Sequence, residues 1–149
     1  MNADDAIQIL LAEDNPGDAE LTVRALARAD LPGKVHWVGD GAAALEFVLG
    51  AGRSESRALK LILLDLQLRK VDGIEVLRRL KADTDTRAIP VVVMLSPEDP
   101  RRLAESYRLG ANSCIVKPIS CDAFMETVAE VCRYWLRQNR GLRPPDMKA

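Results

Sequence analysis

Five polar residues directly follow short apolar runs of the chain: Glu13, Asp14, Asp65, Ser96 and Lys117. The four runs read IQILLA, LILL, PVVVML and SCIV. Each has the length and the continuous Ile, Val and Leu content of a strand that is buried on both faces. In a parallel sheet the carboxyl ends of all strands open onto one edge, where open α/β sheets bind ligands. We therefore expect three carboxylates, a hydroxyl and a lysine to converge on one small site.

This combination of groups suits a phosphoryl group carried on a carboxylate. Carboxylates that crowd together raise one another's proton affinity unless a cation lies among them. Mg²⁺ needs only one or two carboxylates, a carbonyl and water, and Lys117 adds a mobile positive charge. These cations neutralise a phosphoryl group while Ser96 donates a hydrogen bond to it. Aspartyl phosphates are recognised covalent intermediates, so Asp65, at the end of the central apolar run, is the expected nucleophile.

Length and composition narrow the class of protein. The 149 residues, 48% of them hydrophobic and 29% charged, fit one domain with its own core. A net charge of −1 argues against nucleic acid as the main partner, and no apolar run reaches the length of a membrane span. The N-terminal MNADDA is acidic, unlike a signal peptide, and the cysteines form no C-x-x-C pair, so we expect a cytoplasmic protein.

Strand-like and helix-like runs alternate along the chain, which favours repeated βαβ units and a parallel sheet. The expected strands are residues 7–12, 34–38, 59–64, 89–95 and 113–116. The expected helices are residues 16–29, 42–49, a segment after Asp72–Gly73, 100–109 and 122–138. Residues 50–57 (GAGRSESR) are polar and are expected to form a loop.

Taken in order, these motifs resemble the receiver domain of response regulators, the phosphoacceptor half of two-component signalling. The resemblance rests on the pair Glu13–Asp14, on LLDLQLRKVDG around Asp65, on Ser96 after the fourth strand, and on Lys117–Pro118. The stretches VGDGAAALEFV, LRRLKAD and RYWLRQN are most similar to the single-domain regulators encoded beside bacterial phytochrome histidine kinases.

We therefore predict an α/β fold, with a doubly wound, flavodoxin-like sheet of five parallel strands in the order 2-1-3-4-5 and five helices. The receiver domain is expected at residues 5–139, with a flexible tail at 140–149. Since only about ten residues follow the domain, we expect the signal to be passed on by contact with another protein rather than by an attached DNA-binding or catalytic domain.

The resemblance implies a role for each motif residue. It makes Asp65 the phosphoacceptor, with Mg²⁺ held by Glu13, Asp14, Asp65 and the backbone carbonyl of Gln67, Asp14 more directly than Glu13. The family takes its phosphoryl group from a histidine kinase and catalyses the transfer itself.

Two further positions follow from the same resemblance. Ser96 is expected to bond the phosphoryl group and to shift inward on activation, while Lys117 pairs with the phosphate. The Lys117–Pro118 peptide bond is expected to be cis.

Three residues depart from the pattern of the family. Pro97 follows the serine and has no N–H to give to a phosphoryl oxygen. Cys114 stands where the family usually has an aromatic ring that turns inward, so any switch must use other contacts. Arg69 replaces a usual proline, and it either helps to bind phosphate or pairs with a carboxylate in the unphosphorylated state.

The last predicted helix carries two apolar stripes, and a helix on a sheet needs only one broad buried face. Phe124, Val128, Val131 and Trp135 form one stripe; Met125, Ala129, Cys132 and Leu136 form the other. The simpler interpretation is one wide core face with Ala129 and Cys132 at its margin. The preferred hypothesis is a homodimer through this helix, with the second stripe at the interface.

Alternative functions follow from the same residues. Pro97 and Cys114 motivate a receiver-shaped binding module whose state is set by dimerisation or partner binding. A phosphohydrolase with an aspartyl nucleophile is disfavoured because no cap domain or substrate pocket is evident. Taken singly, Asp65 could cap a turn and Lys117 could be solvated, but their combination favours the site.

Overall fold

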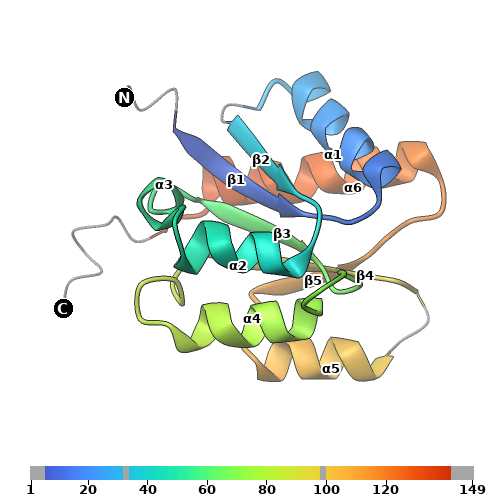
Figure 1. Cartoon of the computed structure of the whole chain (residues 1–149). Helices are drawn as coiled ribbons and strands as arrows, with labels where there is room; N and C mark the ends of the chain where they lie inside the picture. The colour runs from blue at the N-terminus through green and yellow to red at the C-terminus, as the bar shows by residue number, and fades with distance from the viewer. Residues whose placement is uncertain (1–5, 32–33, 98–99, 142–149) are drawn as a thin grey trace.

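The computed structural model describes residues 6–31, 34–97 and 100–141. Five parallel strands form one sheet in the order β2-β1-β3-β4-β5 (Figure 1), which confirms the predicted fold class and strand order. The strands are β1 (Ile7–Ala12), β2 (Lys34–Val38), β3 (Leu61–Asp65), β4 (Val91–Leu95) and β5 (Ser113–Val116).

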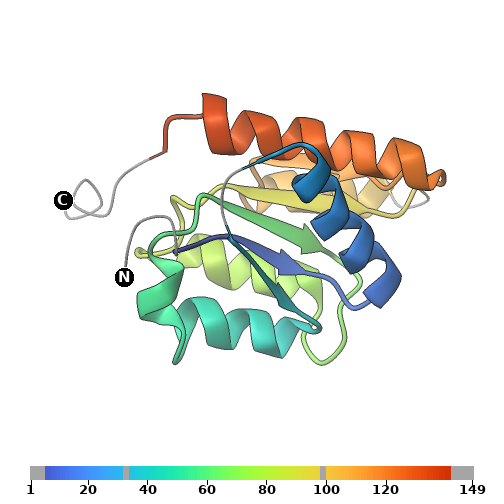
Figure 2. The ribbon, with the colours of Figure 1, turned by 90° about the horizontal axis from the view of Figure 1, so that it is seen from above.

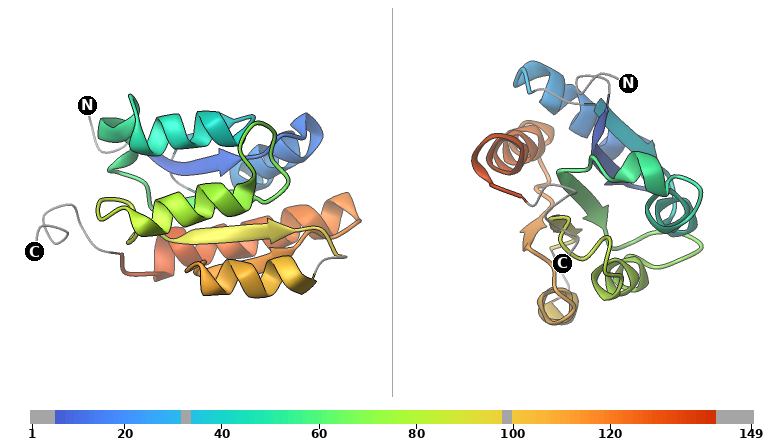
Figure 3. Two further views of the ribbon diagram at one scale, coloured as in Figure 1. Left: turned by 60° about the horizontal axis from the view of Figure 1, so that its bottom comes forward. Right: turned by 90° about the vertical axis from the view of Figure 1, so that its left-hand side faces the viewer.

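Helices cover both faces of the sheet, as Figures 1 and 2 show. They are α1 (Pro16–Arg28), α2 (Gly41–Leu49), α3 (Arg53–Ser56), α4 (Gly73–Ala82), α5 (Pro100–Arg108) and α6 (Cys121–Arg133). Helices α1 and α6 pack on one face, and α2, α4 and α5 lie on the other (Figure 3). None of the helices in the described part is long and apolar enough to cross a membrane.

The sheet is buried because its central strands are apolar on both faces. Every residue of β3 and β4 is buried. Alternate side chains enter opposite cores, as the pleat of a strand requires: Ile62 and Leu64 join the core under α2 and α4, whereas Leu61 and Leu63 join the core under α1 and α6. This packing holds the carboxyl ends of β1, β3, β4 and β5 at one edge.

The described residues contain one helix more than predicted. Helix α3 forms in the segment that was expected to be a loop. Arg53 pairs with Asp83 and Asp85 at 3.2 and 3.4 Å, and the Ser56 hydroxyl donates to the Arg53 carbonyl at 2.8 Å. The two ion pairs are tertiary contacts and the serine bond is local; together they stabilise a turn of helix that sequence periodicity cannot reveal.

The end of the chain also differs in detail from the prediction. Helix α6 continues into a π-helical turn at Tyr134–Gln138, and Ser120 caps its start by accepting from the N–H of Ala123. The expected tail lies outside the described residues from residue 142 onward. The domain bounds 5–139 therefore stay a prediction.

The proposed dimer stripe on α6 is wrong for two of its four residues. Cys132 is fully buried and Leu136 is 8% exposed, both within the core that α6 forms with α1 and the sheet. Burial raises the pKa of the Cys132 thiol to about 12. The core face of the helix therefore draws on both stripes, since Phe124 and Val128 of the first are buried in the same core. Only Met125 and Ala129 of the proposed dimer stripe are half-exposed.

Candidate functional site

Lys117 lies at the centre of a cluster of carboxylates at the carboxyl edge of the sheet. Its Nζ donates to Oε1 of Glu13 at 2.6 Å, to Oδ2 of Asp65 at 2.9 Å and to Oδ2 of Asp18 at 3.0 Å. Strands β1, β3 and β5 supply three of these groups, so the convergence expected from the strand ends is present. Asp18 was not predicted from the sequence, although it lies four residues after Asp14, at the start of a helix, and could have been placed near the same edge.

The cluster has an excess of negative charge in a buried place. Glu13 is fully buried and Asp65 is 6% exposed. Burial, and after it the neighbouring Asp65, raises the pKa of Glu13 to about 8, although Lys117 opposes both effects. For Lys117, burial alone would lower the pKa, but its bonds to Glu13 and Asp65 raise it above the ordinary lysine value. One ammonium group therefore does not balance the carboxylates around it.

A divalent cation fits this arrangement. Glu13, Asp14 and Asp65 each offer a carboxylate oxygen, and these oxygens lie within 4.8 Å of one another. Oxygen ligands of this kind suit the hard cations Mg²⁺ and Mn²⁺. Arg69 lies 3.8 Å from Asp14, which agrees with one of the two roles considered for it, pairing with a carboxylate when no phosphate is present.

The loop between β3 and α4 fixes the Asp65 carboxylate. Oδ1 of Asp65 accepts from the N–H of Gln67 at 3.0 Å, which leaves Oδ2 for Lys117. The loop closes through the N–H of Gly73, which donates to the Leu66 carbonyl at 2.9 Å. A Cβ atom at Gly73 would lie 2.4 Å from Leu66 Cα and 2.6 Å from the Asp65 carbonyl oxygen. Only glycine permits this close turn.

Beside Asp65 is a hollow of about 250 Å³. It is lined by Asp65, Leu66, Gln67, Met94, Leu95, Ser96 and Arg102. Ser96 is exposed at its rim, one residue beyond β4. Arg102 was not anticipated, because no local pattern distinguishes it from the other arginines of its helix.

The strand register reveals a feature of β4 that the sequence analysis missed. Asp65 is paired with Met94, so the next position along β4 is Leu95, which is 4% exposed. An aliphatic side chain cannot bond a phosphoryl oxygen. The hydroxyl of Ser96 lies one position further on, and its role stays a prediction.

The expected cis bond before Pro118 is wrong, since the described residues contain no cis peptide bond. The trans form is the ordinary ground state even before proline. Of the atypical residues, Pro97 is exposed and Cys114 is half-buried in β5. The backbone N–H of Cys114 donates to the Tyr107 hydroxyl at 3.2 Å, which links β5 to α5 without an aromatic ring at residue 114.

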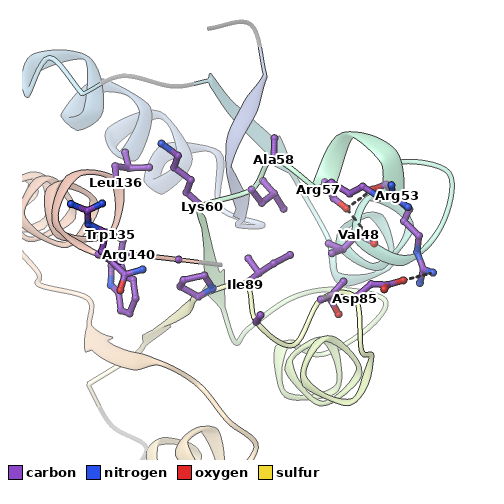
Figure 4. A pocket seen from close by; sticks show the side chains of 17 residues that line it. Val48, Arg53, Arg57, Ala58, Lys60, Asp85, Ile89, Trp135, Leu136 and Arg140 are labelled. Carbon is purple, nitrogen blue, oxygen red and sulfur yellow. Dashed lines mark hydrogen bonds and ion pairs between the residues drawn. The ribbon is translucent and has the colours of Figure 1, made fainter. Parts of the chain in front are cut away.

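A larger cavity of about 560 Å³ lies at the opposite edge of the sheet, before the first residues of β3 and β4 (Figure 4). Ile89 and Trp135 contribute apolar walls, and Lys60 and Arg140 bring positive charge. None of the carboxylates around Lys117 lines this cavity. The carboxylates around Lys117 therefore belong to the carboxyl edge and not to this cavity.

The sequence matches the family model of the response regulator receiver domain over residues 9–129. The chain belongs to this family. Receiver domains are signalling proteins that work with histidine kinases, and this chain has the phosphoacceptor role in two-component signalling.

Relatives extend over nearly the whole chain. It is 42% identical over 147 residues to the probable methanogenesis regulatory protein FilR2 of Methanothrix harundinacea, covering 97% of this chain and 93% of FilR2. It is 34% identical over 129 residues to response regulator Rcp1 of Synechocystis, covering 86% and 88% of the two chains.

Two solved structures have the same fold. The Mn²⁺-bound form of Rcp1 superposes with a TM-score of 0.83 at 31% identity, covering 91% of this chain and 99% of that one. The phosphorylated cyanobacterial phytochrome response regulator RcpA gives 0.83 at 34% identity, covering 91% and 98%. The expected resemblance to phytochrome-associated regulators is thus confirmed.

Proposed function

We propose that Asp65 is the phosphoacceptor of this receiver domain. A carboxylate oxygen of Asp65 attacks the phosphorus of a phosphohistidine, the new O–P bond forms, and the N–P bond breaks as the imidazole leaves and regains its proton. The observation that supports this most directly is the position of Asp65 between Lys117 and the hollow. A group transferred to its carboxylate has both a cation and space beside it.

Mg²⁺ is the expected cofactor, and Glu13, Asp14, Asp65 and the Gln67 carbonyl would hold it. When bound, it would neutralise negative charge on the phosphoryl oxygens. The chain's own residues do the rest. Asp65 is oriented by the Gln67 N–H, and Lys117 already bonds its second oxygen, so little reorganisation is required before transfer.

The donor we propose is a sensor histidine kinase of the phytochrome type in the cytoplasm. RcpA, a phytochrome response regulator, supports this by its shared fold and 34% identity. The similarity to a methanogenesis regulatory protein makes a kinase with another input the competing possibility.

Self-association through α6 would use Met125 and Ala129, since the other two residues of the stripe are buried.

A second function is favoured by Leu95 and Cys114. Leu95 ends β4 without a hydroxyl and Cys114 leaves β5 without an aromatic ring, which favours a protein-binding module that partners recognise without phosphate. The two functions differ in whether phosphorylation changes the affinity for a partner.

The test is phosphotransfer from a phosphorylated histidine kinase in the presence of Mg²⁺. We expect the phosphoryl label to move to the wild type but not to Asp65→Asn. Asp122→Asn, a substitution at an exposed residue of α6, is the control and should be labelled as the wild type is. Peptide mapping should place an alkali-labile phosphate on Asp65. Labelling of Asp65→Asn at the wild-type rate would overturn the assignment.

A further inference from the structure

Arg102 reaches from α5 across the loop that carries Asp65. Its Nη2 donates to the Leu66 carbonyl at 3.0 Å and to both oxygens of the Asp72 carboxylate at 3.0 Å. The same residue lines the hollow beside Asp65, whereas Lys117, which bonds the Asp65 carboxylate, is not among its lining residues. A guanidinium group therefore already lies at the wall of the space where a phosphoryl group on Asp65 would sit.

The Leu66 carbonyl and the Asp72 carboxylate keep other hydrogen bonds if the Arg102 side chain moves. The Leu66 carbonyl also accepts from the N–H of Gly73 at 2.9 Å. Oδ2 of Asp72 also accepts from the N–H of Ile74 at 3.1 Å, and the Asp72 side chain is 48% exposed to water. Leaving these partners creates no buried unsatisfied group, and a half-exposed ion pair contributes little to stability.

A phosphoryl group is the stronger partner for a guanidinium. Phosphorylation adds nearly two negative charges at neutral pH and three acceptor oxygens, and the planar fork of arginine binds such oxygens in pairs. Lys117 is already shared among the carboxylates of Glu13, Asp18 and Asp65. Arg102 therefore supplies a second cation for the incoming charge, in addition to Lys117.

We propose that Arg102 is the phosphate-sensing residue of this domain, exchanging Asp72 for the phosphoryl group on Asp65 and moving α5 with it. The inference rests on the proposed phosphorylation of Asp65. Movement of α5 reaches β5 through the Tyr107 hydroxyl, which accepts from the backbone of Cys114. This route requires neither a ring at residue 114 nor a hydroxyl at residue 95.

Affinity for a phosphoryl mimic tests the exchange. The probe is beryllium trifluoride with Mg²⁺, titrated into the full chain. Loss of one charge-assisted paired contact should weaken binding about tenfold or more in Arg102→Ala, with Arg102→Lys in between. Arg101→Ala, one residue away and exposed, is the matched control and should bind as the wild type does.

A variant of the present partner separates sensing from a merely structural role. Asp72→Asn keeps a side chain that can cap α4 but removes the charge that competes for Arg102, so it should bind the probe more tightly than the wild type. If Arg102 only held the loop in place, Asp72→Asn would weaken binding of the probe just as Arg102→Ala does. That result would overturn the proposal.

Amide NMR then tests the movement of α5. In the wild type and in Arg101→Ala, phosphorylation should shift the signals of α5 and of Cys114; in Arg102→Ala, Asp65 should still gain phosphate while these shifts are lost. Unchanged shifts in phosphorylated Arg102→Ala would refute the proposal. Absence of phosphate gain in the wild type would instead refute the acceptor assignment on which it rests.

Discussion

Replacing Gly73 by alanine should displace the acceptor loop while leaving the rest of the fold intact. The added Cβ atom would lie 2.4 Å from Leu66 Cα and within 2.8 Å of the carbonyl oxygens of Asp65 and Leu66. All three contacts are with backbone atoms, so no side chain can rotate away. Ordinary contact begins at 3.4 Å, which means that the loop must move by about 3.4 − 2.4 = 1.0 Å, the scale of misplacement that impairs catalysis.

Two magnitudes follow from this displacement. Overpacking a rigid site costs about 1–3 kcal/mol of folding free energy, partly offset by the roughly 0.5–1 kcal/mol that alanine gains over glycine inside a helix. Misplacing a reacting group by about 1 Å lowers a rate by up to about 100-fold. We therefore expect Gly73→Ala to fold with reduced stability and to accept phosphate far more slowly.

Gly39→Ala is the matched control, because a Cβ atom there meets nothing within 4 Å. Chemical denaturation gives the free energy of unfolding of each variant, and the rate of mass gain with a small acyl phosphate donor gives the phosphorylation rate. Gly39→Ala should match the wild type in both. If Gly73→Ala also matched the wild type in both, the argument that this turn fixes the acceptor would be refuted.

Three further predictions concern the metal, the pH dependence and the core. Mg²⁺ at a hundredfold excess over its Kd should stabilise the wild type by about 2.7 kcal/mol and Asp14→Asn by less, and equal stabilisation of both would contradict the assigned ligand. Burial lowers the pKa of Lys81 from 10.5 to about 8, so the unfolded chain holds this proton more tightly than the folded chain does. The free energy of unfolding should therefore rise from pH 8 to 10.5. If Lys81→Met showed the same rise with pH in denaturation curves, Lys81 would be excluded as its cause. Leu136→Ala should cost about 2–4 kcal/mol on denaturation, whereas half-exposed Tyr134→Ala should cost less than about 1 kcal/mol, and equal costs would contradict the assignment of Leu136 to the core.

The fold and the meeting of the polar site residues at one edge were predictable because each of these strands ends at a polar residue. Continuous apolar runs define β3 and β4, and a polar residue marks where each run meets the edge of the sheet. For this reason Glu13, Asp65 and Lys117 were placed together correctly. Helix caps such as Ser120 are local signals and were predictable for the same reason.

The remaining features depend on the register of strand pairing and on how helix α6 is rotated about its axis. Local sequence patterns determine both only weakly. The sequence placed Ser96 after the strand, but only pairing with β3 shows that Leu95 separates it from the residue beside Asp65. The burial of Cys132 depends on how α6 is rotated on the sheet. Arg102 acts through contacts with residues 30 and 36 positions away, and no local pattern predicts contacts over that separation.

The most direct test of the account is the intact mass of the protein after incubation with a small acyl phosphate donor and Mg²⁺, for the wild type and Asp65→Asn. The account predicts a gain of one phosphate in the wild type, dependent on Mg²⁺, and none in the variant. An equal gain in Asp65→Asn would contradict the central claim that Asp65 is the acceptor. No gain in a wild type that binds Mg²⁺ would contradict the claim that the domain catalyses its own phosphorylation from a small donor.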